Sequence, residues 1–312
     1  MPSLQQSTQQ LEQNSLRLFY DGKIEEGIGL LRSELNAADP NVLSSADRAR
    51  LLAVMGKLHS HQAFLMNSSL DVALESLNEA VQIAEELGEN ETLGIALSYR
   101  GFATYTNTFH NAIGHYQDAL PDIDRSLEIR EEIEDVRGIA ESLIYQGILY
   151  ERTEQPARAN ANYERAAQIT HEHGFELEES YAVRHLAFIR QNDGDLEGAR
   201  EYFERSLELR QKAGFRTGLA LSHFSLGGVL LDLKRYDEAL EQLNHAESYA
   251  SEFGLTRVRT LCHYLLGEGA TAQGDVDEAV AQLERSRDLS REIDYEVGVQ
   301  REETKLRELL SG

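Results

Sequence analysis

A spaced pattern of small and large residues recurs along most of the chain and constrains its fold more than any other feature. In each copy an alanine is followed at the fourth position by a large apolar residue, and at the third position after that by Ala or Ser. The copies are Ala73/Leu77/Ala80, Ala119/Ile123/Ser126, Ala159/Tyr163/Ala166, Ala199/Phe203/Ser206, Ala239/Leu243/Ala246 and Ala279/Leu283/Ser286. From Ala119 onward the first alanines recur at a constant interval, and only the step from Ala73 to Ala119 is longer. This period predicts stacked copies of one supersecondary unit.

A second small residue precedes each copy and serves as a landmark. In the last four copies it precedes the alanine at a constant distance, as Gly147 precedes Ala159. The landmarks are Gly56, Gly101, Gly147, Ala187, Gly227 and Gly267. Two small residues on either side of a gap predict two helices that approach closely at both points, so each unit is expected to be a hairpin of a helix A and a helix B. The large residue of the pattern is expected to fill the space toward the next hairpin.

Turn residues and composition agree with an all-helical chain. Residues 192–195 (Asn-Asp-Gly-Asp) fit a turn between two helices, and Gly174, Gly214 and Gly254 fit left-handed C-caps of helices B. The chain has 4 Pro and no Trp, and its abundant Ala, Leu, Glu, Arg and Gln favour helix. The fold class expected is all-α.

The same residues carry a family resemblance. The series Leu143, Gly147, Tyr150, Ala159, Tyr163 and Ala166 resembles the tetratricopeptide repeat (TPR) signature at matching spacing. The resemblance covers six repeats over residues 42–294, and a degenerate copy at Gly27, Leu31 and Glu34 extends it toward the N-terminus. It implies a right-handed superhelical solenoid of antiparallel helix pairs.

The chain departs from the family pattern in two places. The usual Trp is replaced by Leu52, Leu97, Leu143, Val183, His223 and His263, and the closing Pro is replaced by Gly. A period of about 40 residues with a terminal Gly resembles the longer-repeat branch found in kinesin light chains, G-protein-modulator scaffolds and bacterial peptide-sensing regulators.

We therefore expect a single TPR-like solenoid over residues 1–312. Its parts are a degenerate hairpin (1–41), six repeats (42–90, 91–136, 137–176, 177–216, 217–256 and 257–294) and a C-terminal cap helix (295–312).

The resemblance also indicates which side chains line the groove of the solenoid. These lie at the third and second positions before each landmark and at the position after it. Among them are aromatic side chains, together with a cationic pair formed by Arg184 and His185, that would be exposed to a partner. The predicted partner-binding residues are Tyr99, Phe102, Tyr145, Arg184, His185, Phe188, Phe224 and Tyr264. The alternative, that an individual aromatic packs against the next repeat, stays open.

Charge and cysteine content exclude several classes of function. With 30 Lys+Arg and 54 Asp+Glu the net charge is −24, which argues against a nucleic-acid or anionic-membrane partner. Residues 128–135 (EIREEIED) are interpreted as a solvated outer helix face. One cysteine, Cys262, and a start without a basic leader or an apolar core predict a cytoplasmic protein.

No enzymatic or cofactor motif emerges. His59, His61, His110 and His115 have no Cys or acidic residue at ligand spacing, so surface histidines are favoured over a metal site. Cys262 is expected to be a buried, inert thiol. We predict no catalytic residues, no metal and no cofactor.

The function predicted is a non-enzymatic scaffold or adaptor that binds a protein or peptide segment in its aromatic groove. The alternative is a regulatory sensor that responds to a peptide or a small ligand, as in the bacterial TPR regulators.

Two repeats are longer than the others. The intervals from Gly56 to Ala73 and from Gly101 to Ala119 both exceed the constant interval of the later repeats, which Gly147 and Ala159 illustrate. Residues 106–117 are expected to form a long connection or an extended helix A followed by a turn at Gly114. The inserted residues would form a projecting rim on which Phe109, Ile113 and Tyr116 expose apolar area, although a neutral difference in length is the alternative.

Truncation tests the repeat architecture. Because each repeat contacts only its neighbours, removing residues 255–312 is expected to leave the preceding repeats folded and to reduce the helical signal by about a fifth. Far-UV circular dichroism with thermal melting measures this. Loss of all helicity would indicate a single globular core instead.

Overall fold

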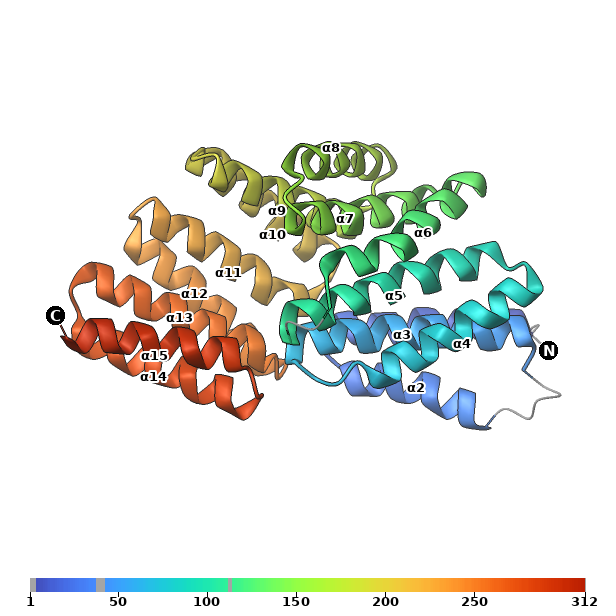
Figure 1. Ribbon diagram of the computed structural model, residues 1–312, viewed down its shortest axis with the longest axis horizontal. Coiled ribbons are helices and arrows are strands. Elements are labelled where there is room, and N and C mark those ends of the chain that lie inside the picture. The colour runs from blue at the N-terminus through green and yellow to red at the C-terminus, as the bar shows by residue number, and fades with distance from the viewer. Residues whose placement is uncertain (1–3, 38–42, 112–113, 312) are drawn as a thin grey trace. The chain divides into compact units, whose positions relative to one another are not determined.

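The fold is all-α, as expected. The computed structural model describes residues 4–37, 43–111 and 114–311, and every regular element in them is a helix (Figure 1). The elements are α1 (Leu4–Tyr20), α2 (Ile24–Ala37), α3 (Ser45–Met66), α4 (Asp71–Leu87), α5 (Asn90–Asn111), the 3-10 helix η1 (Tyr116–Ala119), α6 (Leu120–Glu132), α7 (Val136–Arg152), α8 (Pro156–His173), α9 (Glu176–Asn192), α10 (Leu196–Lys212), α11 (Arg216–Asp232), α12 (Tyr236–Glu252), α13 (Thr256–Gln273), α14 (Val276–Glu292) and α15 (Glu296–Ser311).

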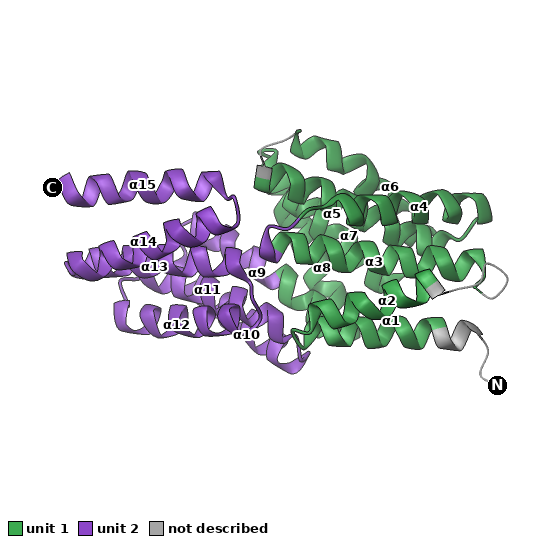
Figure 2. Ribbon diagram, turned by 90° about the horizontal axis from the view of Figure 1, so that it is seen from below, with its two compact units in different colours: residues 1–64, 69–182 green, residues 65–68, 183–312 purple. Residues whose placement is uncertain are grey.

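The chain divides into two compact units (Figure 2). Unit 1 comprises residues 1–64 and 69–182, and unit 2 comprises residues 65–68 and 183–312. In both units consecutive helices pack as hairpins, such as α7 with α8 in unit 1 and α11 with α12 in unit 2. That all the hairpins form one continuous solenoid stays a prediction.

In the five hairpins that have a landmark glycine, this glycine of helix A lies against the large apolar residue of helix B. A Cβ atom added to Gly56 would lie 2.3 Å from Leu77 Cγ, and one added to Gly147 would lie 2.5 Å from Tyr163 Cε1. Gly101 meets Ile123 in the same way, Gly227 meets Leu243, and Gly267 meets Leu283. The large residue was expected to fill space toward the next hairpin. Its main contact is instead within its own hairpin, where its side chain occupies the volume next to the glycine of helix A.

Residues with a positive φ angle recur once per helix, which is twice as often as the helix pairs. Every twentieth residue from Gly114 (φ 79°) to Asp294 (φ 52°) has a positive φ angle. Gly174, Gly214 and Gly254 are among these residues, with φ between 66° and 68°, which confirms them as left-handed residues at the ends of helices B. Several of the positions hold non-glycine residues, namely Glu134, Glu154, Lys234 and Asp294.

The two long repeats lengthen their A helices. Helices α3 and α5 have 22 residues each, whereas α7 has 17. After α5 the chain turns at Gly114, and Pro121 lies in the first turn of α6. The extended helix followed by a turn at Gly114 is thus the arrangement that forms.

Aromatic side chains on these extensions pack on one another. The ring of Phe109 stacks on Phe64 at 6.0 Å between centroids and on Tyr105 at 5.7 Å, and Tyr116 lies 5.8 Å from Tyr105. Phe109 and Tyr116 are partly buried against the core of unit 1, so the expectation that they expose an apolar rim was wrong. Ile113 lies outside the described residues.

The C-terminal helix continues the pattern. Helix α15 packs on α14, and Arg257 of α13 stacks over the ring of Tyr295 at 4.1 Å. In the part of the chain that the structure describes, no helix is both long and apolar enough to cross a bilayer.

A pair of neighbouring glycines tests the landmark contact. In Gly227→Ala the new Cβ would lie 2.7 Å from Leu243 Cγ, and such overpacking costs about 1–3 kcal/mol of unfolding free energy. In the matched control Gly228→Ala the Cβ would meet only Leu265 Cδ1, at 3.6 Å, and alanine favours the helix by about 0.5–1 kcal/mol. Urea denaturation should therefore show a lower free energy of unfolding for Gly227→Ala and a higher one for Gly228→Ala. Equal effects of the two substitutions would contradict the role of Gly227.

Candidate binding site

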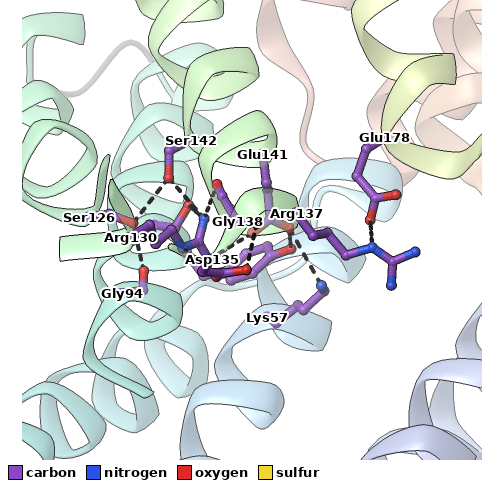
Figure 3. A network of polar contacts seen from close by, with 12 residues as sticks. Lys57, Gly94, Ser126, Arg130, Asp135, Arg137, Gly138, Glu141, Ser142 and Glu178 are labelled. Carbon is purple, nitrogen blue, oxygen red and sulfur yellow. Dashed lines mark hydrogen bonds and ion pairs between the residues drawn. The ribbon is translucent and has the colours of Figure 1, made fainter. Parts of the chain in front are cut away.

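Helices α3, α5, α6 and α7 of unit 1 bring charged and aromatic side chains together around Glu141 of α7 (Figure 3). The Tyr99 hydroxyl of α5 donates a hydrogen bond to this carboxylate. Arg130 of α6 donates from Nη2 at 2.9 Å, and Lys57 Nζ of α3 lies 3.6 Å away. One carboxylate on α7 thus contacts side chains of three other helices. The Glu141 side chain is only 19% exposed, so these contacts are largely desolvated.

Arg130 is a buried cation that links two hairpins. Its side chain is 2% exposed, and its Nη1 donates to the Gly138 carbonyl and to Ser142 Oγ, both at 2.8 Å. A Cβ atom on Gly138 would lie 2.0 Å from Asp135 Oδ2 and 2.6 Å from Arg130 Nε, so the glycine leaves room for both side chains. The interpretation of residues 128–135 as a solvated face is therefore wrong for Arg130. A buried charge is tolerated only when it is paired and hydrogen-bonded, as this one is.

Unit 2 contains the same arrangement two repeats further along the chain. Arg210 is fully buried, and its Nη1 donates to the Gly218 carbonyl at 2.7 Å and to Ser222 Oγ at 3.1 Å. The arginine, glycine and serine thus recur at the same offsets in both units, which makes them part of the repeat.

Burial and charge oppose each other in shifting the pKa of Glu141 but act together on the pKa of His61. Burial alone would raise the pKa of Glu141, but Lys57 and Arg130 with their charges, and the hydrogen bonds from Tyr99 and Arg130, lower it to about 2. Burial, reinforced by the charge of Lys57, lowers the pKa of His61 to about 3. Glu141 is therefore charged and His61 neutral at neutral pH.

The predicted groove residues of unit 1 pack against one another and against His61. The His61 ring lies 5.6 Å from Tyr99 and 5.2 Å from Phe102, and Phe102 stacks on Tyr145 at 5.0 Å. Lys57 Nζ lies 4.7 Å from the centre of the Tyr99 ring. Tyr99 and Phe102 are only 1% and 7% exposed, so their expected exposure was wrong, and the packed alternative holds for both. Tyr145 is half-buried.

The other predicted residues lie in unit 2, and all of them except His185 are half-buried. The Arg184 guanidinium lies 5.2 Å from the centre of the Phe188 ring and 3.5 Å from His185 Nε2, and Phe188 packs edge-on against Phe203. His185 is buried, whereas Arg184 and Phe188 are half-buried. The structure thus brings Arg184, His185 and Phe188 into one cluster.

Phe224 and Tyr264 follow on the next two A helices of unit 2. Phe224 lies on α11 and is half-buried. Tyr264 lies on α13, where the Arg301 guanidinium covers its ring at 4.0 Å. On the same helix Glu268 pairs with Lys305 of α15 at 2.9 Å. This A-helix face therefore combines apolar rings with cations.

The two histidines that stand where the family pattern has Trp are buried and hydrogen-bonded within the fold. His223 and His263 bond through Nδ1 to Gln242 at 2.8 Å and Gln282 at 2.6 Å, and burial lowers the pKa of both rings. Among the described residues no group of His, Cys, Asp and Glu side chains could hold a metal ion. Cys262 is buried, and burial raises the pKa of its thiol.

Comparison with known proteins identifies the fold. Residues 179–252 match the tetratricopeptide repeat family. NprR in complex with its cognate peptide NprX is similar in structure, with a TM-score of 0.64 and 15% identity over 95% of this chain and 82% of that chain. A dimer of human IFIT1 with PPP-AAAA has a TM-score of 0.62 and 12% identity, over 93% of this chain and 59% of that chain.

A Rap protein complexed with Competence and Sporulation Factor is similar over nearly its whole length. Its TM-score is 0.59 at 13% identity, over 98% of this chain and 98% of that chain. A search of curated proteins finds no match. The protein thus has a TPR-like helical repeat fold.

Neutralising the central carboxylate tests the charge cluster. Glu141→Gln leaves Arg130 and Lys57 without their shared anion, and we expect a loss of about 3 kcal/mol of unfolding free energy at pH 7. The pKa of Glu141 is lower in the folded chain than its ordinary 4.5, so its stabilisation is complete above that pH and is lost as the pH falls toward about 2. In urea titrations the difference in unfolding free energy between Glu141→Gln and wild type should therefore become smaller below pH 4.5.

The control is Glu128→Gln, which removes the same charge from an exposed position on α6. It is expected to change the unfolding free energy by less than about 0.5 kcal/mol. A loss in Glu141→Gln that is as large at pH 3 as at pH 7 would show that the charge of Glu141 is not its source.

Proposed function

We propose that this protein is a non-enzymatic scaffold or adaptor that binds an extended or helical segment of a partner protein on its A-helix faces. The observation that carries the proposal is the presence of one half-buried aromatic side chain on each of three successive A helices, namely Phe188 of α9, Phe224 of α11 and Tyr264 of α13. Aromatic residues that are partly accessible and lie near cations are the residue types that dominate binding energy at protein interfaces.

The cations of the same face define the partner's chemistry. Arg184 beside His185 suits a carboxylate of the partner, because a guanidinium can donate charge-assisted hydrogen bonds while its plane stacks on Phe188. The net charge of −24 disfavours nucleic acid and anionic membranes as partners. A cytoplasmic location belongs to the proposal, because the chain has one cysteine and therefore no internal disulfide.

A second candidate function is a sensor that responds to a short peptide. The complexes of NprR with NprX and of a Rap protein with Competence and Sporulation Factor support it, because these proteins share the fold. In a sensor the bound peptide would change the conformation of the helix stack, whereas in an adaptor it would only tether the partner. Hydrogen exchange with and without the ligand distinguishes the two.

Substitutions in unit 2 test the binding surface. A pull-down with mass spectrometry supplies the partner, and calorimetry then measures its affinity for Arg184→Ala and Phe188→Ala. Each variant is expected to weaken binding by about 1–3 kcal/mol. Arg205→Ala, on α10 with its side chain 46% exposed, is the control and should leave the affinity unchanged. Wild-type affinity in both test variants would place the site elsewhere.

A further inference from the structure

Glu178 is an incompletely paired carboxylate on the A-helix face of unit 1. It lies in the first turn of α9, and its side chain is 14% exposed. One oxygen, Oε1, is 3.4 Å from Arg137 Nε. The other, Oε2, is buried and accepts no hydrogen bond from any described residue. A buried carboxylate oxygen without a donor costs free energy, so a ligand donor there would relieve it.

The one cation that pairs with Glu178 among the described residues is poorly fixed. The Arg137 side chain is 60% exposed, and its guanidinium also lies 4.7 Å from the Phe175 ring. Figure 3 shows Glu178 and Arg137 beside the cluster around Glu141. A mostly solvated arginine contributes little to pairing, since exposed ion pairs are weak.

The same face already holds one ammonium group of the chain itself. Lys57 Nζ lies 4.7 Å from the centre of the Tyr99 ring and 3.6 Å from a Glu141 carboxylate oxygen. A cation between an aromatic ring and a carboxylate is favourable where water is scarce. Burial, helped by the charge of Glu178, raises the pKa of the Tyr20 hydroxyl of α1.

We infer that Glu178 is the binding position for a guanidinium or ammonium group of a basic partner segment. The inference rests on the proposed binding function and adds to it a specific chemistry: the segment carries an Arg or Lys whose donors complete the hydrogen bonding of Oε2. The acidic balance of the whole chain attracts such a segment, and the partly buried Glu178 selects its position.

Binding at this position is coupled to proton release. Four side chains act on Glu178 through their charge: Arg137 and Glu141 of α7, Lys57 of α3 and Tyr20 of α1. Burial, helped by the charge of Glu141, raises the pKa of Glu178 above its usual range, against the lowering effects of Arg137, of a hydrogen bond from the backbone N–H of Glu178 itself and of Lys57. A cation on Oε2 lowers this pKa, so binding releases protons at any pH at which Glu178 of the free protein is partly protonated.

The experiment compares two probe peptides on the full chain. One is an acetylated, amidated pentapeptide with a central arginine between two leucines, and the other replaces the arginine by neutral citrulline. Calorimetry at pH 7 should show that wild type binds the arginine peptide about tenfold more tightly, and that Glu178→Gln removes this preference. Glu128→Gln removes the same net charge from an exposed position and should retain it.

Three results would overturn the inference. These are equal affinity of wild type for the two peptides, equal losses of the arginine preference in Glu178→Gln and Glu128→Gln, and the absence of proton release on binding at every acidic pH at which the protein stays folded. An unchanged melting temperature of Glu178→Gln confirms that its fold is intact. Failure here leaves the proposed function untouched, because that is tested separately by Arg184→Ala and Phe188→Ala with the captured partner.

Discussion

The packing of one large side chain over one glycine is the contact on which five of the hairpins depend. Where Tyr163 lies over Gly147, its ring occupies the space in which any other residue would place a Cβ atom. Two helices can then approach with their backbones close together, and their remaining side chains interdigitate at native density. A hairpin formed in this way leaves apolar faces on both sides, which its neighbours bury, so the local contact determines the stacked architecture.

Buried charge adds a second layer of order to the apolar stack. Arg130 reaches from the end of one helix B into the next hairpin, where a carbonyl, a serine and Glu141 receive its donors. Hydrophobic contacts would permit small rotations of one hairpin on another, whereas these hydrogen bonds are satisfied only in one arrangement. The desolvation of the ions consumes most of their attraction, so their main effect is on the geometry of the stack. Arg210 applies the same constraint within unit 2.

The two small residues Gly147 and Ala159 were sufficient to predict that α7 and α8 pack as a hairpin, whereas the contact of Tyr163 with Gly147 was not predicted. The sequence also contained a signal for Arg130 that the acidic surroundings concealed: Ala119, Ile123, Ser126 and Arg130 follow one another at helical spacing on the buried stripe. A residue's place on that stripe was more informative than the charge of its neighbours.

The binding surface was less predictable than the fold. The positions expected to line the groove do lie on the A helices, but exposure depends on neighbours that are distant in sequence. Tyr99 is covered by His61 and Tyr145, and nothing in its own segment indicates this. Glu178 escaped notice because an underpaired carboxylate is recognised only when the donors around it are known.

The regular spacing of the left-handed residues has a consequence for how this chain can vary in length. From Gly114 to Asp294 each helix and its turn together have a constant length, including places where Glu154 or Lys234 adopts the conformation without being glycine. One added residue within a helix would rotate all following side chains by about 100° relative to the buried stripe. Extra residues are therefore compatible with the repeat only at helix ends that lead into a turn. The additional residues of α3 and α5 lie at such ends.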